Sequence, residues 1–261
     1  MNSEYLDFTK YEAFFLDLDG VLVKSSHVLP GAPEFLRFLS DFGPVAILSN
    51  NSTRSRRVFA GNLRDKGLEV TPEMVVNSAF VASQFLLSTE GKSKVFMIGE
   101  EGLAEELQDA GHEIVEPKKA EYVVVGMDRD LTYEKLSRAL FALVNGAEFI
   151  ATNSDGTYPT KDRLVPGAGA MVGAIRGMGY EPREVVGKPS PRAVQAGLKA
   201  LDLESAENCL LVGDRLETDI LAANNANMDS VLVLTGISGR EEAENGDISP
   251  NWIADDLNQL M

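Results

Sequence analysis

Short apolar runs alternate with longer amphipathic segments along most of this chain. The runs are four or five residues long and end in small polar or acidic residues, a pattern typical of parallel strands that are buried on both faces. They predict strands at residues 13–16, 45–48, 95–98, 122–125, 147–151, 208–212 and 231–234, with a last short strand at 252–253. Apolar residues at helical spacing between the runs predict helices near 33–42, 53–66, 79–87, 101–110, 133–144, 170–178 and 191–201. The alternation predicts an α/β protein with a doubly wound, Rossmann-like parallel sheet.

The middle of the chain is long enough to form a second, smaller core. From residue 77 onward the strands and helices form a series of their own, which ends near residue 182. We therefore expect a discontinuous core domain of residues 1–76 and 183–261, interrupted by a smaller α/β domain of residues 77–182. Within the insertion, residues 152–159 are polar and lack periodicity, which predicts a loop.

The charge balance and the cysteine content limit the partners and the compartment. The 261 residues carry a formal net charge of −16, so no basic field would attract nucleic acid or an anionic membrane surface. No apolar run approaches the length that spans a bilayer. Cys209 is the only cysteine, which excludes an intrachain disulfide and fits a reducing cytoplasm. These features predict a cytoplasmic protein that binds neither nucleic acid nor membrane.

Two acidic residues follow the first apolar run, with one residue between them. In an extended chain Asp17 and Asp19 would project from the same face, and Gly20 permits a sharp turn beyond them. An isolated Asp-x-Asp is most often an Asx turn after a strand. Two carboxylates held together repel each other, however, and such a pair is stable when a cation lies between them or when the two acids have different roles.

Polar residues also follow three other apolar runs, and a lysine precedes one of the predicted helices. The runs end at Ser49-Asn50-Asn51, at Gly213-Asp214 and at Thr235-Gly236, while Lys188 precedes a helix that begins at Pro191. The carboxyl ends of parallel strands meet at one edge of a sheet, where such folds bind their ligands. Small polar residues between a strand and a helix suit an anion. Because the acids outnumber the lysine, we also expect a hard cation with oxygen ligands, Mg²⁺ by default.

Taken in order, these stretches resemble the four motifs of the haloacid dehalogenase (HAD) superfamily. The stretches are Asp17-Leu18-Asp19-Gly20-Val21, Ser49-Asn50-Asn51, Gly187-Lys188-Pro189, and Gly213-Asp214 followed by Asp219. Pro30-Gly31-Ala32, Arg54 and the position of the insertion are similar to the NagD-like, p-nitrophenylphosphatase-like branch, whose members carry an α/β cap between the second and third motifs. Ser154 and Val23 depart from that branch, so the resemblance does not fix the substrate.

The resemblance implies a phosphatase that works through an aspartyl phosphate. Asp17 would attack the phosphorus, and Asp19 would protonate the leaving alcohol and then deprotonate the attacking water. One Asp17 oxygen, the Asp19 backbone carbonyl and Asp214 would hold Mg²⁺, with Asp219 orienting its waters. Lys188 would neutralise the charge on Asp17 and on the phosphate.

The resemblance also implies groups that bind the substrate, a small phosphorylated metabolite. Ser49, the Asn50 amide and Asn51 would contact the phosphoryl oxygens, and the cap would close over the site and exclude water. In the cap, the polar loop 153–158, with Asn153 and Asp155, is the candidate for substrate selection. An exposed edge of the cap sheet could pair two copies, so we also expect a homo-oligomer that forms through the cap.

Three other functions fit part of the pattern. A dehalogenase or phosphonate hydrolase of the same superfamily would normally lack the second acid, Asp19. A non-hydrolytic, receiver-like regulatory protein also groups acids, a hydroxyl residue and a lysine around Mg²⁺, but its acid pair is adjacent and the insertion would be unexplained. A binding or scaffold protein on the same fold would not need every polar motif residue. The phosphatase therefore explains most of the chain.

Overall fold

Residues 6–24, 27–160 and 163–261 are described by a computed structural model, and they fall into two units. Unit 1 comprises residues 1–49, 59–76 and 188–261, and unit 2 comprises residues 50–58 and 77–187. Residues 50–58, which are predicted to belong to the core domain, therefore group with unit 2. The boundaries predicted at residues 77 and 182 remain a prediction, because a unit defined by dense contacts is not the same as a domain that folds alone.

Unit 1 is built on a six-stranded sheet with the order β15-β14-β13-β1-β4-β5. The strands are β1 (Ala13–Asp17), β4 (Val45–Ser49), β5 (Val75–Asn77), β13 (Cys209–Gly213), β14 (Asp229–Val233) and β15 (Trp252–Ala254). β1 pairs in parallel with both β13 and β4, so that Leu16 lies opposite Val212 and Ile47. Every residue of these three strands is buried, as their continuous apolar runs indicate. Their carboxyl ends adjoin one another and form the edge that carries the polar motifs.

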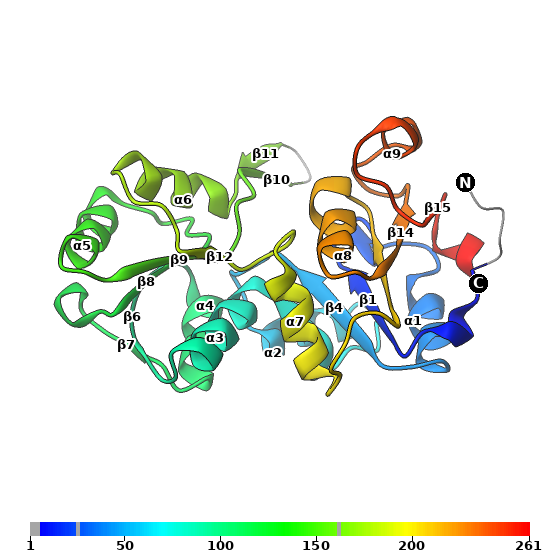
Figure 1. Ribbon diagram of the computed structural model, residues 1–261, viewed down its shortest axis with the longest axis horizontal. Coiled ribbons are helices and arrows are strands. Elements are labelled where there is room, and N and C mark those ends of the chain that lie inside the picture. The colour runs from blue at the N-terminus through cyan, green and yellow to red at the C-terminus, as the bar shows by residue number, and fades with distance from the viewer. Residues whose placement is uncertain (1–5, 25–26, 161–162) are drawn as a thin grey trace. The chain divides into compact units, whose positions relative to one another are not determined.

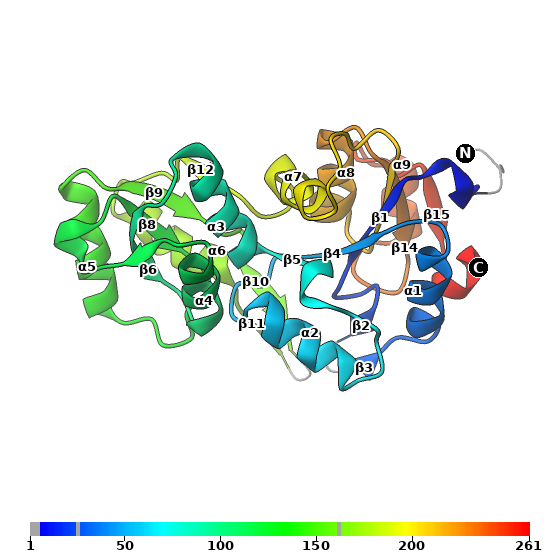
Figure 2. The ribbon, with the colours of Figure 1, turned by 90° about the horizontal axis from the view of Figure 1, so that it is seen from below.

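Helices cover both faces of the unit 1 sheet. They are α1 (Ala32–Ser40), the part of α2 (Arg56–Arg64) from residue 59 onward, α7 (Pro191–Ala200), α8 (Leu221–Asn225) and α9 (Arg240–Asn245). Shorter elements are η1 (Phe8–Lys10), η2 (Pro72–Met74), the π-helix η4 (Leu216–Ile220), η5 (Leu257–Leu260) and the hairpin of β2 (Val23–Lys24) and β3 (His27–Val28). Figure 2 shows α7 and α8 on one face of the sheet and α1 on the other. The fully buried Phe14, Leu16 and Phe35 belong to the main core on the α1 side.

Unit 2 has its own five-stranded sheet with the order β12-β9-β8-β6-β7. The strands are β6 (Lys94–Ile98), β7 (Glu113–Ile114), β8 (Tyr122–Val125), β9 (Glu148–Ala151) and β12 (Glu184–Val185), and a hairpin of β10 (Thr157–Pro159) and β11 (Leu164–Pro166) stands beside them. The helices are α3 (Ser78–Thr89), α4 (Glu101–Asp109), α5 (Tyr133–Val144) and α6 (Ala168–Gly177), with a short turn η3 (Pro117–Lys119). Within this unit α5 and α6 cover one face of the sheet and α3 and α4 the other (Figure 1). Two parallel sheets with helices on both faces confirm the predicted α/β, Rossmann-like fold.

The structure corrects several predicted elements. The helix predicted from Thr53 begins at Arg56, because the Asn51 side chain accepts a hydrogen bond from the Thr53 backbone N–H at 2.8 Å and holds the chain in an Asx turn. The predicted loop 152–159 contains β10, and α9 lies in a segment whose polar composition did not indicate a helix. β5, β7 and β12 are only two or three residues long, too short to appear as apolar runs. In the described part of the chain, no helix combines the length and the apolar character needed to cross a bilayer.

Candidate active site

β1 carries Asp17 to the carboxyl edge of the unit 1 sheet, and the turn beyond it presents Asp19. Asp17 is buried, whereas Asp19 is exposed. The Leu18 carbonyl accepts a hydrogen bond from the Val23 backbone N–H at 3.0 Å, which closes the turn. Gly20 lies inside it with φ at +97°, a value that residues with a side chain rarely adopt. The local geometry therefore requires glycine here. The strand ends at Asp17 and Asp19 lies in the turn after it, so the extended chain on which the predicted shared face depends does not reach Asp19.

A buried ammonium group lies against Asp17. Lys188, which is 4% exposed, donates hydrogen bonds to Asp17 Oδ1 and, at 2.6 Å, to Asp219 Oδ1. Burial alone would lower the pKa of Lys188, but the two carboxylates outweigh it and raise this pKa above its ordinary value. The lysine lies just before α7, which begins at Pro191 with Ser190 as its N-cap. Lys188 is therefore fully charged at neutral pH.

Two further acids reach the site from the end of β13. Asp214 follows Gly213 directly, and Asp219 lies in the first turn of the π-helix η4. Asp219 Oδ2 accepts hydrogen bonds from the backbone N–H groups of Arg215 at 3.1 Å and Asp214 at 3.3 Å, which turns its carboxylate back over the strand end. One oxygen from each of Asp17, Asp214 and Asp219 lies within 4.8 Å of the others. The predicted cluster of these three acids is thus present in the fold.

The clustered acids disfavour one another's ionised form. Burial raises the pKa of Asp17 well above its ordinary value, although Lys188 opposes the rise. Burial, with a further contribution from Asp219, raises the pKa of Asp214 to about 7. A divalent cation among these oxygens would offset the repulsion. Two ligands on opposite sides of Mg²⁺ are about 4 Å apart and those of Ca²⁺ about 5 Å, so the spacing fits a hard divalent cation.

Asp19 differs from the other acids in its surroundings. Its side chain is exposed to solvent, but protein atoms crowd the carboxyl group. This partial desolvation raises the pKa of Asp19, while Lys188 and Lys66 oppose the rise. A carboxyl group with a raised pKa that solvent can reach suits proton transfer to and from a substrate.

The motif at the end of β4 has residues in both units: Ser49 belongs to unit 1, and Asn50 and Asn51 belong to unit 2. Ser49 is buried at the end of the strand, next to β1. The next residue, Asn50, belongs to unit 2, where its carbonyl accepts a hydrogen bond from the Asn153 amide at 2.7 Å. Its own side-chain amide donates to Asp155 Oδ2 at 2.9 Å, and Asn51 forms the Asx turn described above. The structure thus brings Asn153 and Asp155 onto Asn50, while the binding roles of all these residues stay predictions.

One segment of the site had no role assigned by sequence reasoning. After β14, the Ile237 backbone N–H donates a hydrogen bond to Asp214 Oδ2 at 2.9 Å. The Thr235 hydroxyl donates to the Gly20 carbonyl at 2.5 Å. In the sequence, only the position of Thr235-Gly236 at the end of an apolar run points to this segment. The contacts themselves use the Thr235 hydroxyl and the Ile237 backbone amide, and a sequence pattern does not reveal such contacts.

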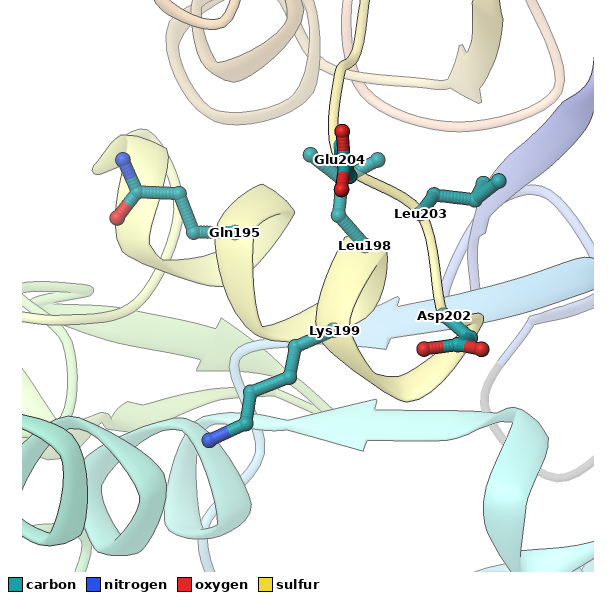
Figure 3. Close-up of a pocket in the computed structure, with 6 residues that line it drawn as sticks. All are labelled: Gln195, Leu198, Lys199, Asp202, Leu203 and Glu204. Carbon is teal, nitrogen blue, oxygen red and sulfur yellow. The ribbon is translucent and has the colours of Figure 1, made fainter.

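A surface hollow of about 430 Å³ lies at the other end of unit 1 from the acids. Its lining residues are Gln195, Leu198, Lys199, Asp202, Leu203 and Glu204 (Figure 3). These residues end α7 and lead to the start of β13, whereas Asp214 follows the end of that strand. The hollow therefore lies apart from the catalytic candidates, and its residues serve below as controls.

Comparison with known proteins covers nearly the whole chain. The haloacid dehalogenase-like hydrolase family profile matches residues 14–113, and a HAD-hydrolase-like profile matches residues 185–260. The acid sugar phosphatase of Staphylococcus epidermidis is 36% identical over 250 residues, which cover 95% of this chain and 96% of that protein. The chain belongs to the HAD-like hydrolases.

Solved structures place this HAD hydrolase among the phosphatases. The p-nitrophenyl phosphatase from Archaeoglobus fulgidus superimposes with a TM-score of 0.90 at 37% identity, covering 96% of this chain and 98% of that one. A 4-nitrophenylphosphatase from Thermotoga maritima gives 0.90 at 33% identity, with 97% of each chain covered. These neighbours and a putative NagD protein at 32% identity, with a TM-score of 0.88 and coverage of 95% and 96%, confirm the NagD-like resemblance. The protein is a HAD phosphatase, an enzyme class that uses a divalent metal ion, and its acid cluster fits that requirement.

Proposed function

We propose that this HAD phosphatase hydrolyses small phosphate monoesters, with sugar phosphates as the first candidates, and that it requires Mg²⁺. The observation that carries the proposal is the contact of Asp17 with Lys188 beside Asp214 and Asp219. The printed names of the relatives support the substrate class, since they include acid sugar phosphatases. Phosphoglycolate, pyridoxal phosphate and nucleoside monophosphates are further candidates for a substrate panel.

The proposed reaction has two displacement steps at phosphorus. Asp17 forms a bond to phosphorus while the ester P–O bond breaks, and the leaving alkoxide takes the proton of Asp19. Asp19, now a carboxylate, then takes a proton from water, which attacks the phosphorus and breaks the aspartyl-phosphate bond. Lys188 holds Asp17 in place and offsets the negative charge that accumulates around the phosphoryl group. The products are the free alcohol and inorganic phosphate.

The acids also provide the proposed metal ligands. Asp17, Asp214 and the Asp19 backbone carbonyl would hold Mg²⁺, with Asp219 orienting its waters. When bound, Mg²⁺ would attract the phosphoryl oxygens and neutralise part of their charge. Oxygen donors suit this ion.

The remaining proposals concern binding and location. Ser49, the Asn50 amide and Asn51 are proposed to contact the phosphoryl oxygens, and Asn153 and Asp155 to select the substrate. We propose a homo-oligomer formed through the cap, residues 77–182, whose helix α5 exposes Phe141 and Val144. The absence of any second cysteine and the acidic charge support a cytoplasmic enzyme without nucleic-acid or membrane partners.

Release of inorganic phosphate from p-nitrophenyl phosphate tests the proposal. The protein as purified should turn over with added Mg²⁺ and lose activity when a chelator removes divalent ions, because the acid cluster would then repel the phosphate. Restoring Mg²⁺ should restore the rate. Undiminished turnover in chelator would contradict the metal requirement. A substrate that is bound but never hydrolysed would instead favour the receiver-like alternative, which the comparisons leave without support.

Asp19→Asn should slow hydrolysis of sugar phosphates by about 100-fold or more, because their alkoxide leaving groups need a proton. p-Nitrophenolate leaves without one. With p-nitrophenyl phosphate, rapid mixing should therefore show a burst of p-nitrophenol followed by slow turnover, since only the second step has lost its base. Equal losses in both steps, or none, would contradict the acid–base assignment.

A further inference from the structure

The segment after β14 contacts one carboxylate oxygen of Asp214. This segment, residues 235–238, is called the strap below. The Ile237 backbone N–H donates to Asp214 Oδ2 at 2.9 Å, and the Ser238 backbone N–H donates to the Asp214 carbonyl at 3.0 Å. The Ile237 side chain is 60% exposed, so its backbone rather than its side chain contacts the acid. The strap thus holds both the side chain and the main chain of Asp214.

Both ends of the strap are anchored to unit 1. The Thr235 hydroxyl donates to the Gly20 carbonyl at 2.5 Å, and the Ser238 hydroxyl accepts a hydrogen bond from the Leu216 backbone N–H at 3.0 Å. The Lys24 ammonium donates to the Thr235 carbonyl at 2.9 Å. These bonds link the strap to the turn after β1 and to the start of η4, the two segments that carry the other acids.

Two glycines also lie close to Asp214 Oδ2. A Cβ atom built at Gly236 on the strap would overlap this oxygen, and so would one built at Gly20 in the turn after β1. No side chain fits at either position while Asp214 keeps its place. Oδ2 is therefore crowded by the backbone at two glycines and also accepts a hydrogen bond from Ile237.

We propose that the strap holds Asp214 as a one-oxygen metal ligand and thereby favours Mg²⁺ over Ca²⁺. This inference rests on the proposed function, in which Asp214 binds the ion. Mg²⁺ requires a near-octahedral shell and takes one oxygen from a carboxylate, whereas Ca²⁺ accepts six to eight oxygens and often takes both from one group. With Oδ2 bonded to Ile237 and crowded by Gly20 and Gly236, Oδ1 is the oxygen left more open to an ion, an arrangement that suits the smaller cation.

Calorimetric titration of the metal-free full chain with Mg²⁺ alone and with Ca²⁺ alone tests the inference. Gly236→Ala displaces Asp214 and should weaken Mg²⁺ binding by about 10- to 100-fold, the usual effect of losing a group that orients a ligand. Ca²⁺, which tolerates irregular geometry, should lose less. Gly239→Ala is the matched control, because Gly239 has φ at −95° and no atom near its built Cβ, and it should bind both ions as the wild type does.

A second pair of variants tests the hydrogen bond itself. Ile237→Pro removes the backbone N–H and should shift the ratio of the two dissociation constants toward Ca²⁺ by about tenfold or more, whereas Ile237→Ala keeps the N–H and should keep the wild-type ratio. Thermal unfolding of each metal-free variant shows whether it is folded.

The outcomes separate the strap from the proposed function. If the wild type binds Mg²⁺ and hydrolyses phosphate but Gly236→Ala and Ile237→Pro keep its ion preference, the strap inference is overturned alone. If the variants lose affinity for Mg²⁺ and Ca²⁺ by the same factor and unfold at a lower temperature, the role of the strap is only structural, and the inference is overturned as well. A wild type that binds no Mg²⁺ and works in chelator would overturn the metal requirement first, and the strap inference with it.

Discussion

Asp17→Asn should reduce phosphate release by about four orders of magnitude or more, because the amide cannot form the aspartyl phosphate. Asparagine has the size of aspartate, and Lys188 keeps its second partner, Asp219. The packing around the site should therefore survive. Steady-state hydrolysis of p-nitrophenyl phosphate measures the loss, and trapping of radiolabelled phosphate on the wild-type chain, absent from the variant, identifies the attacking group.

A matched exchange elsewhere separates chemistry from folding. Asp202 lies in the hollow of Figure 3 and is exposed, with φ at +58°. Asparagine tolerates this conformation, which makes Asp202→Asn a suitable control. It should keep the wild-type rate. Because the raised pKa of Asp17 means that its charge costs stability at neutral pH, metal-free Asp17→Asn should unfold at no lower temperature than the wild type. A near-normal rate in Asp17→Asn would remove it as the nucleophile.

Lys188→Met should reduce the turnover number by about 1000-fold, since it removes a preorganised positive charge from the reacting phosphate. Methionine fills most of the space of the buried stem, but it leaves Asp17 and Asp219 without their shared cation. Removing one partner of a buried ion pair typically costs about 3–5 kcal/mol of stability. Steady-state kinetics and denaturant unfolding measure the two effects, and Lys199→Met, on the exposed end of α7, is the control.

The pH dependence of Lys188→Met follows from the same charges. An acid whose pKa is raised by folding makes the folded state less stable as the pH rises from its ordinary pKa toward the raised one. For Asp214 these values are 3.8 and about 7. Without Lys188, which lowers the pKa of both Asp214 and Asp17, the metal-free variant should lose more stability than the wild type between about pH 4 and pH 7. Equal pH profiles would show that the lysine does not compensate these acids.

The sequence predicts the strands that carry the site because each of them is long and apolar. The runs before Asp17, Ser49 and Asp214 are buried at every position, so each buried strand corresponds to a continuous apolar run in the sequence. The charge imbalance among the motif acids likewise indicated a cation. Asp219 could be placed because its spacing from Asp214 sets it in the first turn of the next helix.

Features that depend on backbone groups could not be read in the same way. The contact of Ile237 with Asp214 uses an N–H that every residue except proline carries, so nothing at that position indicates it. The pairing of Asn50 with Asp155 joins residues that are 105 positions apart. Strands of two or three residues, such as β7 and β12, are defined by their neighbours in the sheet and not by their own composition.

After β13, the π-helix η4 constrains the number of residues between Arg215 and Asp219 more than the identity of the exposed ones. The Ile220 backbone N–H reaches the Arg215 carbonyl, one residue beyond the usual helical partner. Adding or deleting one residue between Arg215 and Asp219 would carry the carboxylate to another side of the helix and away from Lys188. The exposed side chains of this turn could therefore be exchanged without moving Asp219, whereas an insertion there would have to be compensated by a second change in register.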